Sequence, residues 1–162
     1  MSVDRTRSCS WSDPQRLAEV VKETDGAEFL KKIGSGDLPA PPVAETTCIT
    51  MAEIGDGYAR FELTPAEWHH NPIGSVHGGI LSTLADTALG CAVHSTLPAG
   101  TGYTSLDLTI KFTRPATLAS GTLTCEGRVV TSGRRTATAE GRITDGSGRV
   151  IAHAVTTCLL FG

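Results

Sequence analysis

The side chains best suited to chemistry lie between Asn71 and Asp86, around a pair of glycines. His77 directly precedes Gly78 and Gly79, and Asp86 is the only formally charged residue in the apolar run that follows. The first amides of a helix have no intrahelical partner and lie at the positive end of its dipole. Glycines there let the backbone approach a ligand, because they carry no Cβ. Such a stretch could bind the oxygen of a polarised carbonyl group, with a carboxylate nearby as base or nucleophile.

Each of these residues also has a purely structural explanation. The glycines suit a tight turn, His77 suits a hydrogen-bonded and partly buried position, and Asn71 before a proline is ordinary turn chemistry. Asp86 is harder to explain, because it lies too far into a helix to cap it, and an ionised carboxylate away from water needs partners. The residues alone leave both interpretations open.

One long helix must carry Asp86. Apolar residues recur three or four positions apart after Gly78, as on one face of an α-helix. They are Ile80, Leu81, Leu84, Ala85, Ala88, Leu89, Ala92 and Val93. Because the other positions are small or hydroxylic rather than charged, we expect little water around this helix. The proline and glycines from Pro98 onward predict that it ends between His94 and Leu97.

Alternating apolar and polar residues predict strands on both sides of this helix. The segments are 46–54 and 58–63 before it, and 103–114, 121–131, 134–144 and 149–161 after it. Their short links favour antiparallel neighbours. We therefore expect an α+β fold in which a curved antiparallel sheet of about six strands wraps one long helix. An exposed sheet edge would favour pairing with a second copy.

Residues 1–42 are predicted to form an N-terminal helical extension and linker, followed by a single domain over residues 43–162. The capping residues predict one helix from Ser12 or Asp13 to Glu23, and a second from Thr24 or Asp25 that Gly34 stops. The proline-rich segment 35–42 would then be an irregular tether.

The composition excludes several classes of protein. A formal net charge of −3 with scattered arginines gives no nucleic-acid footprint. Five widely spaced cysteines without a C-x-x-C pair indicate reduced thiols rather than a disulfide framework or a thiolate metal site. There is no signal-peptide core at the N-terminus and no run of about eighteen apolar residues. We expect a cytoplasmic protein that does not bind membranes.

The same residues form a recognisable pattern. Asn71-x-x-Gly74-x-x-His77-Gly78-Gly79 precedes Leu84-Ala85-Asp86-Thr87-Ala88, then Ser105-Leu106-Asp107-Leu108 and Phe112-x-Arg114-Pro115. Over residues 43–161 this pattern resembles the hotdog-fold acyl-CoA thioesterases of the phenylacetate-pathway type. The resemblance implies a hotdog fold and hydrolysis of a medium-chain or aromatic acyl-CoA by a homodimer or a dimer of dimers. It implies no metal or redox cofactor.

The resemblance also implies roles for single residues. Gly78 would donate its amide to the thioester carbonyl oxygen, and His77 would orient that end of the site. Asp86 of the partner subunit would be the nucleophile or the general base. Asn71 would position the water or the substrate, and Ser105 would assist from a neighbouring strand.

Further residues are predicted to bind the substrate. Gly79 continues the close backbone approach, and Thr104 would replace Ser105 if the strand were shifted by one residue. The coenzyme phosphates need basic partners, for which Arg114 and the turn Ser132-Gly133-Arg134-Arg135 are the candidates. Two solvated arginines at a turn would explain that sequence as well.

Three alternatives remain at this stage. A hydratase or dehydratase could also use a histidine and a carboxylate on an acyl thioester. A non-catalytic acyl-CoA binding module would keep the pocket but would not need Asp86. Metal-dependent hydrolysis would use His69, His70 and His77, or His153, although their spacing is unlike H-E-x-x-H.

Overall fold

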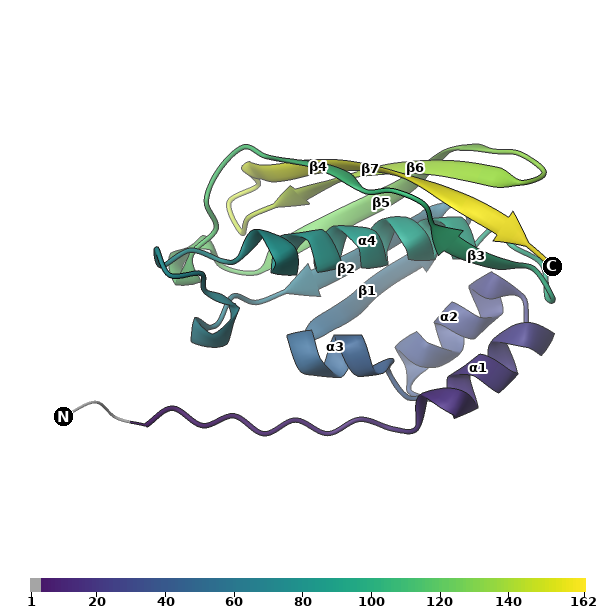
Figure 1. Cartoon of the computed structure of the whole chain (residues 1–162), viewed down its shortest axis with the longest axis horizontal. Helices are drawn as coiled ribbons and strands as arrows, with labels where there is room; N and C mark the ends of the chain where they lie inside the picture. Colours follow the sequence, from purple (N-terminus) through teal and green to yellow (C-terminus); the bar gives the residue numbers. More distant parts are fainter. Residues whose placement is uncertain (1–3) are drawn as a thin grey trace.

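The computed structural model describes residues 4–162, and within them a seven-stranded antiparallel sheet curves around helix α4 (Gly78–His94), as Figure 1 shows. The strands are β1 (Ile49–Gly55), β2 (Tyr58–Leu63), β3 (Gly102–Ser105), β4 (Thr109–Phe112), β5 (Leu123–Ser132), β6 (Thr136–Thr144) and β7 (Val150–Phe161). Their hydrogen-bonded order is β1-β2-β5-β6-β7-β3, and β4 also pairs with β7. This arrangement confirms the predicted α+β fold with a long central helix.

The predicted strand at 103–114 is wrong as a single element, because it divides into β3 and β4. Between them the side chain of Asp107 replaces a backbone partner: its Oδ1 accepts from the Thr157 amide at 3.0 Å, and its carbonyl accepts from Thr156 Oγ1 at 2.6 Å. The two strands keep different registers on β7, since Ser105 pairs with Cys158 and Thr109 with Val155. One extra residue therefore bulges out at 106–108.

Two other predicted boundaries also differ from the structure. Residues 42–47, expected to lead from the tether into a strand, form the short helix α3 (Pro42–Thr47), and β1 begins only at Ile49. Pro42 suits the first turn of a helix because its missing N–H would be unpaired there anyway. The second N-terminal helix does not stop at Gly34 but ends at Ser35, with Gly36 adopting the left-handed conformation at φ 85°.

The core lies between α4 and the concave face of the sheet. The apolar face of α4 is buried there, including Leu84 and Leu89 with no exposed surface. Two glycines opposite each other on β5 and β6, Gly127 and Gly141, let the helix come close to the sheet. A Cβ on Gly127 would lie 2.6 Å from the carbonyl oxygen of Ala88. Backbone contact at this point sets the depth of α4 in the sheet.

Helix α2 (Gly26–Ser35) lies beside β1 and the end of α4, and helix α1 (Pro14–Glu23) packs against α2 (Figure 1). They share a smaller apolar cluster of Leu17, Phe29, Leu30 and Leu38. Gly26 donates its amide to the carbonyl of Leu97 at 2.9 Å, which fixes α2 beyond the end of α4. The division of the chain at residue 42 stays a prediction, and residues 1–3 of the extension lie outside the described range.

The strands at the two ends of the sheet differ. In the described part of the chain, β1 is flanked by α2 and α3, whereas β3 and β4 have only β7 as a neighbouring strand. Within residues 4–162, no helix is both long and apolar enough to cross a membrane.

Candidate active site

Asp86 lies halfway along α4, and its side chain is exposed in the single chain. The expectation of little water around the helix is therefore wrong at this position. Ser105 on β3 donates its hydroxyl to Asp86 Oδ1 at 2.8 Å. Burial, with the charge of Asp86 as a smaller contribution, raises the pKa of the Cys91 thiol to about 12. That thiol stays protonated at neutral pH beside the carboxylate.

The strand register decides between the two adjacent hydroxyl groups. Successive residues of a strand point to opposite faces. Ser105 bonds to the carboxylate of Asp86, whereas Thr104 is exposed. Ser105 is thus the hydroxyl that accompanies Asp86.

Tyr103 belongs to the same site, although the sequence analysis missed it. It lies two residues before Ser105, on the same strand face, and its ring packs against α4 at Gly90. A Cβ on Gly90 would lie 3.1 Å from the Tyr103 hydroxyl. Burial raises the pKa of Tyr103 well above 10, with contributions from Cys91, Cys158 and Asp86. The two-residue spacing from Ser105 was the signal that could have found it.

At the start of α4, His77 caps the helix and separates the roles of the two glycines. His77 Nδ1 accepts from the Gly79 amide at 2.9 Å, so that amide is already engaged. A Cβ on Gly79 would lie 2.9 Å from the same nitrogen, which explains the glycine. Among the described residues, the Gly78 amide has no hydrogen-bond partner. Gly78 therefore supplies the available donor.

Gly78 lines a cavity of about 320 Å³ together with Asn71, Phe112 and Arg114. The side-chain oxygen of Asn71 accepts from the amides of Ile73 and Ser75, and its Nδ2 donates to Ser75 Oγ at 2.9 Å. Since an amide NH₂ has two hydrogens, one remains for a ligand. Arg114 donates to the carbonyl of Val150 at 2.9 Å. The structure thus brings together three of the predicted residues at the N-terminus of α4.

The predicted phosphate site lies at the other end of the sheet from this cavity. Ser132 ends β5, and Gly133, Arg134 and Arg135 are exposed in the turn to β6. The two arginines line a surface depression with Thr101 and Phe161. Arg135 accepts at its carbonyl from Leu160, two residues along β7 from the pairing partner of Ser105. Arg135 and Ser105 are therefore separated by two strand spacings across the sheet and by two residues along the strands, which corresponds to about 12 Å.

Gly78 and Asp86 do not meet within one chain. They are eight residues apart on the same helix, which corresponds to about 12 Å along its axis. A thioester carbonyl that accepts from the Gly78 amide would be too far from Asp86 of the same chain to be attacked from there. If both groups act on one substrate, they must come from two copies.

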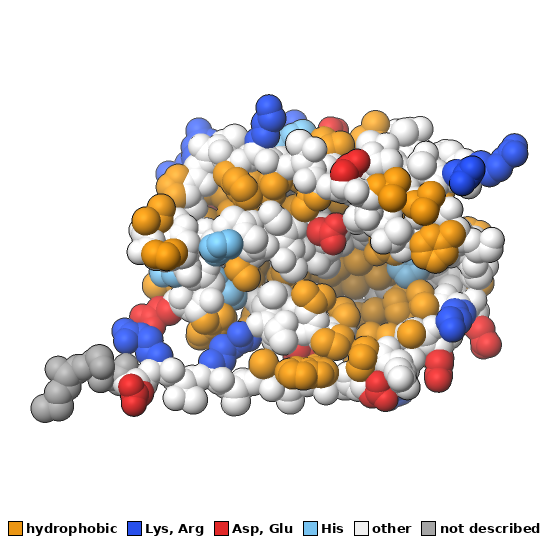
Figure 2. All heavy atoms as spheres, viewed as in Figure 1, with side chains coloured by type: hydrophobic (Ala, Val, Ile, Leu, Met, Phe, Trp, Pro, Cys, Tyr) orange, Lys and Arg blue, Asp and Glu red, His pale blue; other side chains and the backbone are white. Residues whose placement is uncertain are grey.

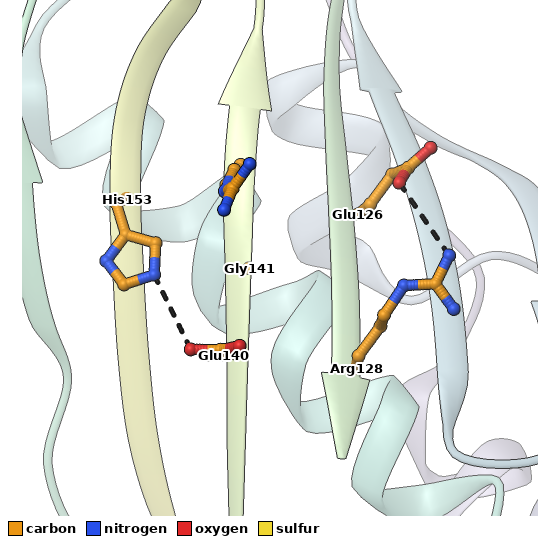
Figure 3. A pocket seen from close by; sticks show the side chains of 6 residues that line it. Glu126, Arg128, Glu140, Gly141 and His153 are labelled. Carbon is orange, nitrogen blue, oxygen red and sulfur yellow. Dashed lines mark ion pairs between the residues drawn. The ribbon is translucent and has the colours of Figure 1, made fainter. Parts of the chain in front are cut away.

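The outer face of the sheet carries a separate, polar depression of about 230 Å³, shown in Figure 3. Glu126 and Arg128 project into it from β5, Glu140 from β6 and His153 from β7, and the two ion pairs drawn measure 4.0 Å and 3.7 Å. None of the predicted catalytic or substrate-binding residues line this depression. It is a solvated charged surface between neighbouring strands.

Two histidines of the metal alternative, His69 and His77, make local hydrogen bonds. His69 accepts at Nδ1 from the Ala66 amide, and its Nε2 lies 3.0 Å from the carbonyl of Thr47. Burial lowers the pKa of His69, which favours the neutral ring. Over the described part of the chain, no three His, Cys, Asp or Glu side chains form a group that could hold a metal ion.

A helix embraced by a curved antiparallel sheet, with an unpaired amide at the helix start and a carboxylate halfway along it, defines a hotdog-fold protein. Residues 73–152 match the family model of the thioesterase superfamily. Over these 80 of its 162 residues the chain is similar to that superfamily.

An individual relative agrees with this similarity. A protein of Halobacterium salinarum that is named as an esterase is 36% identical to this chain over 97 residues. The aligned residues cover 57% of this chain and 62% of that protein. The match thus spans about three-fifths of the relative's length.

Solved structures extend the comparison to most of the chain. A phenylacetic acid degradation-related protein of Ralstonia eutropha is 27% identical, with a TM-score of 0.73 over 80% of this chain and 97% of its own. A hypothetical thioesterase of Streptococcus pneumoniae, solved with coenzyme A, is 28% identical, with a TM-score of 0.64 over 70% and 86%. The PaaI protein of Escherichia coli shares the fold at 24% identity, with a TM-score of 0.73 over 86% and 97%.

Proposed function

We propose that this protein hydrolyses acyl-CoA thioesters at sites shared between two copies of the chain. The observation that carries the proposal is the pair of groups on α4: an unpaired Gly78 amide at its start, and an Asp86 carboxylate held by Ser105 about 12 Å further on. The match of residues 73–152 to the thioesterase superfamily and the coenzyme A bound by the Streptococcus pneumoniae relative support a thioester substrate.

The chemistry follows from what each group can do. The Gly78 amide would donate to the thioester carbonyl oxygen and would stabilise the negative charge that forms when the carbonyl carbon is attacked. Asp86 of the partner subunit would remove a proton from the attacking water, or would itself attack and be released by water afterwards. In either case the C–S bond breaks, the thiolate takes up a proton, and the free acid and coenzyme A leave.

Other residues of the site would position the reactants. Ser105 would keep the Asp86 carboxylate aimed at the substrate through its 2.8 Å hydrogen bond. The remaining Nδ2 hydrogen of Asn71 would bind the water or the acyl carbonyl, and His77 would hold the first turn of α4 in place through Gly79. The proposed reaction requires no metal or redox cofactor.

Pairing of two copies is supported by the open side of the sheet. Leu106, between β3 and β4, is 58% exposed, and Phe112, at the end of β4, is 50% exposed. Apolar side chains on an edge that lacks a strand neighbour favour association with another chain. We propose a homodimer, or a dimer of such dimers, that covers this edge and brings Asp86 of one copy to Gly78 of the other.

Two basic regions would bind the coenzyme phosphates. Arg114 shares the cavity of Gly78, and the exposed Arg134 and Arg135 lie at the end of the sheet near Ser105. Guanidinium groups bind phosphate through paired hydrogen bonds. We propose that the acyl group at the other end of the substrate is medium-chain or aromatic. We also propose that the reaction takes place in the cytoplasm.

Thiol release from short, long and phenylacetyl-type CoA esters tests the proposal. Asp86→Asn keeps the size of the side chain but removes its charge, and we expect it to lower kcat by several orders of magnitude. Asp56→Asn is the matched control, because Asp56 is exposed in the turn between β1 and β2. Circular dichroism and sedimentation must show that both variants fold and associate as the wild type does.

Two outcomes would contradict the proposal. Binding of these esters without thiol release would indicate a non-catalytic acyl-CoA binding module. Conversion of crotonyl-CoA to a hydrated product, again without thiol release, would indicate a hydratase.

A further inference from the structure

The N-terminal helices enclose a largely apolar cavity of about 410 Å³ against α4. Figure 2 shows hydrophobic side chains around a recess between these helices and the middle of the molecule. Leu30 and Ile33 of α2, Ala44 of α3 and Met51 of β1 form its outer and lateral walls. A volume of this size lies in the range of about 300–1,000 Å³ that is usual for small-molecule sites.

The inner wall of this cavity begins next to the proposed catalytic carboxylate. Thr87 and Cys91 of α4 line it, and Thr87 directly follows Asp86. The charge of Asp86 acts on the thiol of Cys91, which is one turn further along the helix than Thr87. Thr87 thus links the inner wall of the cavity to the helical turn that carries Asp86.

The lining selects a type of ligand. Of the described residues that line the cavity, Phe61 is the only aromatic one, and most of the others are aliphatic. An aliphatic wall without paired aromatic faces offers no stacking position for a ring, whereas it matches a flexible hydrocarbon chain. Glu45 lies among the lining residues and is exposed, so it would disfavour a chain that ends in a second carboxylate.

The outer walls of the cavity do not come from the part of the chain that matches the superfamily. Leu30, Ala44 and Met51 all precede residue 73, where that match begins. The N-terminal helices therefore add a wall that the family relationship does not assign.

We propose that this cavity holds an unbranched aliphatic acyl chain, with its carbonyl end at Asp86 and the N-terminal helices as its outer wall. The inference rests on the proposed thioesterase function and narrows its substrates from acyl-CoA esters in general to those with an aliphatic chain. The helices α2 and α3 would then determine chain length.

The test compares kcat/KM across acetyl-, hexanoyl-, decanoyl- and phenylacetyl-CoA. Because each methylene moved from water into an apolar site favours binding by about fourfold, the wild type should prefer decanoyl-CoA to both acetyl- and phenylacetyl-CoA. Ala44→Phe fills the cavity, and we expect it to lower the ratio of decanoyl-CoA to acetyl-CoA kcat/KM by about tenfold or more. Ala40→Phe fills the same cavity from the segment before α3 and gives a second, independent variant.

Ala52→Phe is the matched control, because Ala52 is exposed on β1 and does not line the cavity. It should leave the ratio unchanged. An unchanged ratio in folded Ala44→Phe and Ala40→Phe, or a wild-type preference for phenylacetyl-CoA, would overturn the assignment.

A failure of the proposed function would look different. If the wild type released no thiol from any ester, the thioesterase proposal would fail, and calorimetry with two non-hydrolysable thioethers, decyl-CoA and ethyl-CoA, would test the cavity separately. Tighter binding of decyl-CoA that Ala44→Phe removes would support the acyl site. Equal affinity for the two thioethers would refute it.

Discussion

Replacing Gly78 by proline removes one hydrogen-bond donor and leaves the rest of the helix intact. Gly78 is the first residue of α4, where proline is favoured because its fixed φ suits the helix. The preceding residue, His77, has φ −60° and ψ 136°, an extended conformation that tolerates a following proline. The lost N–H has no partner within residues 4–162, so the folded protein gives up no bond of its own.

The expected effect is therefore on catalysis. If the Gly78 amide stabilises the oxyanion, Gly78→Pro should lower kcat by about 10²–10³-fold, which is about 2.7–4 kcal/mol of transition-state stabilisation. Gly78→Ala is the matched control, because it adds a Cβ but keeps the amide. That Cβ would lie 3.1 Å from the tip of the Phe112 ring. Since Phe112 is 50% exposed, its ring can move by the small distance required.

The assay is steady-state thiol release at saturating acyl-CoA, which separates kcat from KM, with thermal melting to verify that the variants fold. A kcat of folded Gly78→Pro within about threefold of Gly78→Ala would refute the role of this amide, because a lost oxyanion donor costs far more. A loss confined to KM would show that the amide binds the substrate and its transition state equally.

Three other predictions concern the assembly and the fold. The variants Gly78→Pro and Asp86→Asn should each be nearly inactive alone, but should recover about 25% of wild-type activity when they are unfolded and refolded together in equal amounts. Half of the dimers are then mixed, and each mixed dimer has one intact site of two, which combines Gly78 of one copy with Asp86 of the other. No recovery would place both groups in one chain. Gly127→Ala should destabilise the protein by about 1–3 kcal/mol in urea titrations, because its Cβ would lie 2.6 Å from a backbone oxygen of α4; an unchanged midpoint would show that α4 can move away. Hydrogen bonds from Ser147 and Arg149 lower the pKa of Asp145 from its ordinary value of 3.8, so the stability it contributes is present above about pH 4 and is lost as the pH falls below it. Asp145→Asn should therefore lower Tm at pH 7, and its difference from the wild type should shrink between pH 4 and pH 2.

Local sequence signals were enough to predict the central elements. The apolar periodicity after Gly78 and the proline after the helix predicted both ends of α4 correctly. They could do so because the apolar residues of a helix face recur with the period of the α-helix itself. Short turns likewise predicted the antiparallel order of β5, β6 and β7. The signals failed where a tertiary contact replaced a local one, as when the side chain of Asp107 interrupted the strand now divided into β3 and β4.

The sequence by itself determined which residues could do chemistry, namely a glycine at a helix start and one carboxylate in an uncharged helix. Only the tertiary structure decided how they are used. The register of β3 on β7 selected Ser105 rather than Thr104 to bind Asp86, and the ring of His77 took the amide of Gly79 but not that of Gly78. Register and ring orientation depend on contacts between residues far apart in the chain or on side-chain rotation, and neither is encoded in residue spacing.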